Sequence, residues 1–171
     1  DRTAAAIAFY NEFSKLNYLP STPTLFNSGT VFPQLSSCFG TNTYDSLESI
    51  MGSLSEHAQY SKFSGGTSTS YSALRSSGSP IRSTGGKAKG PLPYAKLFND
   101  LLNAFDQGGK RKGVGAYYIE VWHPNIFEVL KARDPGGDAR SRTHDAFPAT
   151  WIPDLFMERV INHGTWSLID P

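Results

Sequence analysis

Cysteine is almost absent from this chain, which has one among its 171 residues, Cys38. One cysteine can form neither an internal disulfide nor a cysteine-based zinc site, so we expect a reducing, cytoplasmic compartment. Long apolar runs are missing too, since none approaches the roughly 18 residues of a membrane-spanning helix. We therefore expect no membrane partner.

An excess of charge is also missing, because 16 basic residues face 15 acidic ones and leave a formal net charge of +1. This balance excludes a surface-wide attraction to nucleic acid polymers or anionic membranes. Two glycine-rich stretches are nevertheless basic, one with Arg82, Lys87 and Lys89 and one with three cations at 110–112. Local basic loops of this kind suit a small anion such as phosphate, because glycine lets backbone N–H groups approach it closely.

Common ligand signatures do not occur in the sequence. There is no P-loop motif, and no dinucleotide fingerprint follows a predicted strand. The four histidines are far apart and show no spacing typical of metal ligands, so we predict no metal site.

The pattern of apolar residues and breakers predicts a globular α/β protein. Strands are predicted over 34–39, 69–75, 114–122, 145–152 and 166–169. Helices are predicted over 3–16, 45–62, 93–105, 124–131 and 153–162. Because a helix follows each of the first four strands, the sheet is predicted to be parallel.

The predicted helix 45–62 has the clearest start. Asp45 is a favoured N-cap residue, and Glu48 three positions later matches a capping box. One face is predicted to be mainly apolar and to point inward, and its positions are Leu47, Ile50, Met51, Leu54, Ala58 and Ser61. The stretches 76–91 and 107–113 are predicted to be loops, and their length and cations favour binding over simple turns.

Cys38 lies in a short uncharged stretch, 34–39, that is predicted to be a buried strand. By composition alone, a lone cysteine is more often a small buried hydrophobe than a reactive thiol. A thiol hydrolase in which His123 acts as the base for Cys38 is a less favoured alternative, because single histidines are more often structural. Composition alone does not decide between a buried structural cysteine and a reactive thiol.

Five motifs together resemble the large, catalytic subunit of ribonucleotide reductase, in a form similar to class I. They are STPTLFN at 21–27, QLSSCF at 34–39, DQGG at 106–109, WHP at 122–124 and WIPDLFM at 151–157. The resemblance implies that 34–171 form the first part of a ten-stranded α/β barrel and that 1–33 end a preceding helical region. It also implies reduction of ribonucleotides to deoxyribonucleotides for DNA synthesis.

The resemblance assigns roles to single residues. It implies that Cys38 is one of two redox-active thiols, which protonates the departing 2′ hydroxyl and then pairs with the other thiol. The implied substrate-binding residues are Thr22, Ser37, Gln107 and Arg111. The residues implied to bind an effector nucleotide are Asp45, Ser46, Leu47, Lys62, Arg75, Arg82 and Ser83.

The resemblance also implies partners. They are dNTP or ATP effectors, thioredoxin or glutaredoxin as reductant, the rest of the large subunit, and a second copy contacted through helix 45–62. The segment itself is expected to bind no cofactor, because the radical comes from a metal-containing small subunit or, less favoured, from adenosylcobalamin. Without a second cysteine the chain is expected to be an inactive piece of a longer or split subunit. A nucleotide-binding module without catalysis is the alternative.

Overall fold

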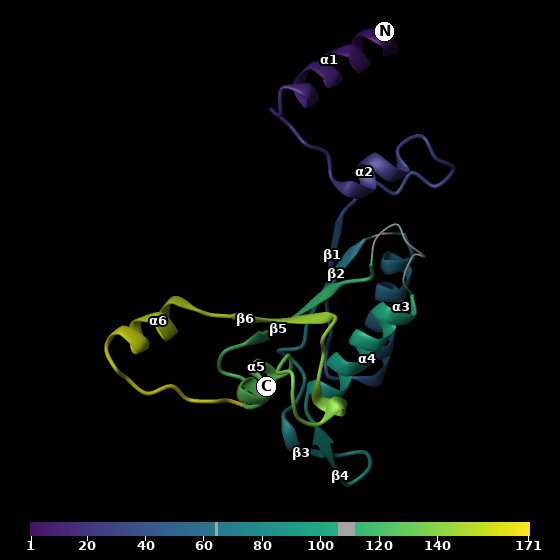
Figure 1. The fold of residues 1–171 in the computed structure, drawn as a ribbon. Coiled ribbons are helices and arrows are strands. Elements are labelled where there is room, and N and C mark those ends of the chain that lie inside the picture. Colours follow the sequence, from purple (N-terminus) through teal and green to yellow (C-terminus); the bar gives the residue numbers. More distant parts are fainter. Residues whose placement is uncertain (64, 106–111) are drawn as a thin grey trace. The chain divides into compact units, whose positions relative to one another are not determined.

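The structure, a computed structural model, describes residues 1–63, 65–105 and 112–171. The chain divides into two compact units, Asp1–Ser37 and Cys38–Pro171 (Figure 1). The division predicted at 33 and 34 stays a prediction, since compactness alone defines these two units. No helix in the described ranges is both long enough and apolar enough to cross a membrane.

The first unit contains helices α1 (Arg2–Ser14) and α2 (Thr22–Asn27). The helix predicted over 3–16 is therefore confirmed, and Asp1 caps it by accepting the Thr3 N–H at 3.0 Å. Helix α2 is not among the helices that the sequence predicts, because proline usually interrupts a helix and Pro23 lies within this one. Pro23 lies in the first turn of α2, where a helix requires no N–H donor.

The second unit is built on a four-stranded parallel sheet. In spatial order its strands are β1 (Cys38–Asn42), β2 (Gly66–Ser70), β5 (Gly115–Glu120) and β6 (Ala146–Trp151). The helices that follow them are α3 (Leu47–Lys62), α4 (Leu92–Ala104), α5 (Ile126–Leu130) and α6 (Asp154–Ile161). The predicted parallel α/β class is confirmed, and strands that lie in chain order without reversal suit the first part of an α/β barrel.

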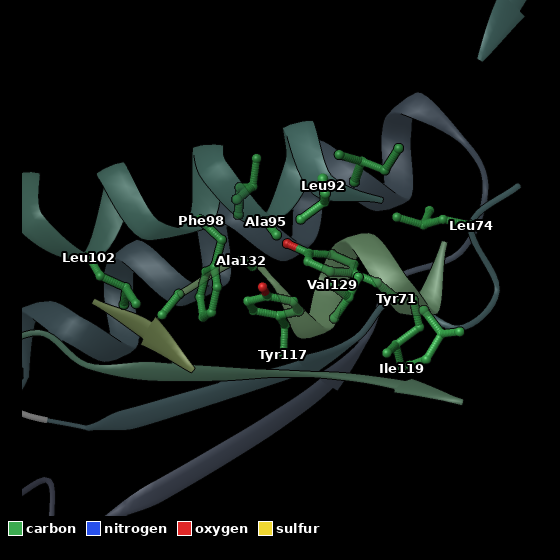
Figure 2. Packing of buried hydrophobic residues seen from close by; sticks show 14 residues of the cluster. Tyr71, Leu74, Leu92, Ala95, Phe98, Leu102, Tyr117, Ile119, Val129 and Ala132 are labelled. Atoms are coloured by element: carbon green, nitrogen blue, oxygen red, sulfur yellow. The ribbon is translucent and has the colours of Figure 1, made fainter. Parts of the chain in front are cut away.

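The core lies between one face of the sheet and helices α3, α4 and α5, with α3 and α4 side by side (Figure 1). Phe98 and Leu102 of α4 reach down to Tyr117 of β5, and all three are at most 1% exposed (Figure 2). Gly115 is required at this point, because a Cβ there would lie 2.5 Å from Phe98 Cζ. Close packing of this kind fixes the distance between α4 and the sheet.

Two strands have bounds that differ from the prediction, and one predicted strand is absent. The strand predicted over 34–39 begins later, and the strand predicted over 69–75 begins and ends earlier. Strand β1 starts at Cys38, because the Gln34 carbonyl accepts from Asn27 Nδ2 at 2.7 Å and is used outside the sheet. Strand β2 ends at Ser70, because a turn follows in which Leu74 N–H donates to the Tyr71 carbonyl. Residues 166–169 form no strand.

The stretch 76–91, predicted as an irregular loop, forms an antiparallel hairpin. Its strands are β3 (Ser77–Ile81) and β4 (Gly86–Lys89). Gly85 adopts φ +68° in the turn, and its N–H donates to the Ile81 carbonyl at 2.9 Å. The alternation of apolar and polar residues that indicates a strand is missing here, because Pro80 and several glycines and serines occupy the hairpin.

Candidate functional site

A pocket of about 610 Å³ lies at the carboxyl end of the sheet. The first turn of α3, the β3–β4 hairpin and the start of α4 enclose it. Five of the seven predicted effector residues line it: Asp45, Ser46, Leu47, Arg75 and Ser83. A second concavity of about 540 Å³ adjoins it, shares four of its lining residues and adds Arg82. The structure thus brings together six of the predicted residues.

An ion pair stands between the two concavities. Arg75 Nε donates to Asp45 Oδ2 at 2.5 Å, and Arg75 Nη1 donates to the Pro80 carbonyl at 3.1 Å. Both side chains are one-third exposed, so the pair contributes at most about 1 kcal/mol to stability. Its main effect is geometric, because it fixes one cationic side chain against the pocket.

The start of α3 differs from the prediction in a way that matters for this pair. Ser46, and not Asp45, is the N-cap residue, and its Oγ accepts the Ser49 N–H at 3.1 Å. The predicted capping box of Asp45 and Glu48 is therefore wrong. Because a hydroxyl caps the helix, the Asp45 carboxylate pairs with Arg75 instead.

The apolar face predicted for α3 is only partly buried. Ile50 and Leu54 point into the core, but Leu47 and Met51 are 71% and 54% exposed. Polar residues take the remaining inner positions, and His57 among them is fully buried. Helix α3 therefore presents an exposed apolar pair beside the pocket.

The charge of the pocket favours an anion. Lys87 and Lys89 of β4 line it together with Arg75, against the single carboxylate of Asp45. The N-terminal end of α3 adds the positive end of a helix dipole. The two lysines were noted in the sequence as a basic cluster but were not named as site residues, since the hairpin that aims them at the pocket was not predicted.

Lys62 does not join the other predicted effector residues within one chain. It lies in the last turn of α3, roughly 22 Å from Leu47 along the axis at about 1.5 Å per residue. Its Nζ lies 5.6 Å from the centroid of the Phe63 ring. The pocket of a single chain is therefore built without it.

Cys38 is at the opposite, amino end of the sheet. It is exposed, which contradicts the predicted buried strand position, and it is the first residue of β1. Thr41 of the same strand bonds to His57 of α3, so alternation along the strand places Cys38 on the face that the helices do not cover. In a closed barrel that face is the interior.

The other predicted substrate residues are not assembled into one site by this structure. Thr22 begins α2 and Ser37 ends the first compact unit. Gln107 and Arg111 lie outside the described residues. Within the described ranges, no group of three or more His, Cys, Asp or Glu side chains could hold a metal ion.

His123 has a structural role in the described fold. It is fully buried, its Nε2 donates to the Leu74 carbonyl at 2.8 Å, and its Nδ1 accepts the Asn125 N–H at 3.0 Å. Burial lowers the pKa of this imidazole and favours its neutral form. Because His123 follows the carboxyl end of β5 and Cys38 starts β1, the thiol hydrolase alternative is contradicted.

Comparison with known proteins identifies the family. The family model for the ribonucleotide reductase barrel domain matches residues 36–171. The chain belongs to this family. The resemblance seen in the five motifs is thereby confirmed, and the four parallel strands are part of a ribonucleotide reductase barrel domain.

Relatives of this ribonucleotide reductase chain come from distant organisms. It is 44% identical to the ribonucleoside-diphosphate reductase subunit alpha of Chlamydia trachomatis over its whole length, which is 16% of that relative. It is 45% identical to the large subunit of Arabidopsis thaliana, again over the whole chain and 21% of the relative. The chain thus spans between a sixth and about a fifth of the length of these relatives.

Proposed function

We propose that this chain contributes the effector-nucleotide site and one redox thiol to the large subunit of a ribonucleoside-diphosphate reductase. The observation that carries the first part is the pocket at the start of α3, where Arg75, Lys87 and Lys89 face one carboxylate. The names of the relatives support the second part, since they are ribonucleoside-diphosphate reductase large or alpha subunits.

The pocket offers different surfaces to the two ends of a nucleotide. Three cations and the end of α3 suit the phosphates of a dNTP or ATP. Leu47, Ile50 and Tyr94 provide an apolar wall against which a base ring can pack. A pocket with one cationic and one apolar side therefore suits a nucleotide better than a bare inorganic anion.

A second copy of the chain completes this proposal. Leu47 and Met51 form an exposed apolar pair on α3, next to the pocket. If two α3 helices pair antiparallel about a twofold axis, Lys62 of each copy comes to the pocket of the other. This arrangement reconciles the predicted role of Lys62 with its distance from Leu47, at the other end of α3, within one chain.

The redox role rests on Cys38. Its thiol is exposed at the uncovered face of the sheet, where a second thiol of the complete subunit can reach it. In the proposed reaction, Cys38 and that thiol give two electrons and two protons to the ribose and form a disulfide. The 2′ C–O bond breaks, the hydroxyl leaves as water, and a C–H bond forms at the 2′ carbon. Thr22, Ser37, Gln107 and Arg111 are proposed to hold the substrate.

The remaining partners of this proposal lie outside the chain. A metal-containing small subunit, or as a less favoured alternative adenosylcobalamin, would supply the radical, and thioredoxin or glutaredoxin would reduce the disulfide. The chain alone has one thiol and cannot form the pair, so we expect it to convert no ribonucleotide unaided. Deoxyribonucleotide formation by the isolated chain would contradict this.

A second candidate is a nucleotide-binding module without catalysis. The favouring observation is that the described residues form the anion pocket, whereas the sequence lacks the second thiol. Replacing Cys38 by Ser in the native enzyme separates the two candidates. Loss of deoxyribonucleotide formation with unchanged nucleotide binding supports the catalytic role, and full activity supports the binding module.

Calorimetric titration with dTTP tests the binding site. Arg75→Ala removes the cation fixed by Asp45 and should raise the dissociation constant at least about tenfold, which corresponds to about 1.4 kcal/mol. Arg140→Ala is the matched control, because Arg140 pairs with Asp138 on the exposed surface, in the 3-10 helix Ala139–Ser141, and does not line the pocket. Equal dTTP affinities for both variants and the unaltered protein would overturn the proposed site.

A further inference from the structure

A carboxylate near the end of the sequence binds residues 76–79, where the β3–β4 hairpin begins and which we call its root. Asp170 Oδ1 accepts the Ser76 N–H at 2.7 Å, and Asp170 Oδ2 accepts the Ser79 hydroxyl at 2.6 Å. Ser76 is only 8% exposed, so its N–H depends on a partner within the protein. These bonds join segments more than 90 residues apart in sequence.

Other contacts make this root a fixed junction. Asn125 Oδ1 accepts the Ser77 N–H at 3.0 Å, and His123 binds the Leu74 carbonyl. The segment that carries Asp170 is itself bound to the residues after β5, because the neighbouring Ile169 N–H donates to the Trp122 carbonyl at 2.8 Å. The backbone on both sides of Arg75 is thereby tied to the segment after β5 and to the segment that carries Asp170.

We propose that Asp170 is a positioning residue for the nucleotide pocket, so that docking of segment 166–171 and nucleotide affinity are coupled. This inference rests on the proposed effector site. Asp170 lines the concavity next to the pocket but acts through Ser76 and Ser79, which set where the hairpin begins. The hairpin in turn carries Lys87 and Lys89 into the pocket.

The charge of Asp170 strengthens the junction. Hydrogen bonds to an ionised acceptor are about twice as strong as neutral ones. The Ser79 hydroxyl and the Ser76 N–H hold the pKa of Asp170 below its ordinary value, so the carboxylate is ionised at neutral pH. Without the Asp170 carboxylate, the buried Ser76 N–H loses its hydrogen-bond partner. The hairpin then samples positions that do not bind nucleotide.

Titration of the native protein with dTTP tests the coupling in a double-mutant cycle. Asp170→Ala should raise the dissociation constant about fivefold to tenfold, and Ser79→Ala about twofold to threefold, from the ordinary strength of such bonds. The double variant should bind like Asp170→Ala alone, because the Ser79 hydroxyl acts through Asp170. Asp138→Ala is the control, since Asp138 pairs with Arg140 on the exposed surface and lines neither concavity, and the affinity of this variant for dTTP should be unchanged.

Amide hydrogen exchange gives a second readout that general destabilisation would not reproduce. In Asp170→Ala the Ser76 amide should exchange at least about tenfold faster, whereas amides of α4 around Phe98 should keep their rates. Asp170→Asn, which preserves shape and one acceptor oxygen, should show smaller changes in the same direction. It also serves if the alanine variant fails to fold.

The outcomes separate this inference from the proposed site. If the unaltered protein binds no dTTP, the proposed site and the coupling both fall. If the unaltered protein binds dTTP and Asp170→Ala and Asp170→Asn bind it equally well, only the coupling is overturned. Additive effects of the Asp170 and Ser79 substitutions would likewise overturn it.

Discussion

Acid should destabilise this protein through one buried imidazole. His57 of α3 is fully buried, with Nε2 3.0 Å from Thr41 Oγ1 and its ring centroid 4.8 Å from that of Phe98. Among the described residues, Nδ1 has no hydrogen-bond partner. Burial lowers the pKa of His57 from 6.5 to about 4, because a charged ring would lose its hydration.

The sign and size of the effect follow from the two pKa values. The unfolded chain binds the His57 proton below pH 6.5, and the folded protein binds it only near pH 4. Between these values protonation favours the unfolded state, so stability is full above pH 6.5 and falls as the pH drops toward 4. The loss by pH 4 is about 3 kcal/mol, at 1.36 kcal/mol for each pKa unit.

Urea unfolding at several pH values between 7 and 4 measures this loss. His57→Gln removes the titrating group and keeps a polar partner for Thr41, so its free energy of unfolding should fall about 3 kcal/mol less over this range. The pKa of His123 is also lowered, but His123 and the carboxylates are present in both proteins. Their contributions to the pH dependence therefore cancel in the comparison. Equal pH dependence in both proteins, or a measured His57 pKa near 6.5, would show that burial of His57 does not cause the loss of stability in acid.

Three further predictions concern packing, capping and assembly. Gly115→Ala places a Cβ against Phe98 and should lower the free energy of unfolding by about 1–3 kcal/mol, measured in urea; an unchanged midpoint would contradict the packing. Ser46→Ala removes the cap of α3 and should cost about 1 kcal/mol, whereas the exposed Ser55→Ala should cost little; equal losses would refute the capping. Met51→Glu should shift sedimentation toward the monomer, and an unaltered dimer would exclude pairing through this face of α3.

The order of elements could be predicted because it depends on local patterns. Breakers separate short apolar runs from helices with one apolar face, and that alternation requires a parallel sheet. Helices α4 and α5 and strands β5 and β6 therefore fall within a residue or two of their predicted bounds. The family resemblance also names six residues that the fold then brings together around two adjoining concavities, and their role in binding a nucleotide stays a prediction.

The failures have physical causes that a sequence pattern does not contain. Asp45 and Ser46 are both good N-cap residues, and the local pattern does not contain the pairing of Asp45 with Arg75, 30 residues away, that accompanies the Ser46 cap. The sequence does not predict the β3–β4 hairpin, because side chains far away in sequence, such as Asn125 and Asp170, hold it in place. Such long-range bonds decide local structure without leaving a local signal.

A crystal structure of the native protein with dTTP would test the central claim most directly. We expect the triphosphate within hydrogen-bond distance of Arg75 and of Lys87 or Lys89, with the base against Leu47 and Tyr94. A nucleotide bound at another place, with the Asp45–Arg75 pair and the β3–β4 hairpin untouched, would contradict it.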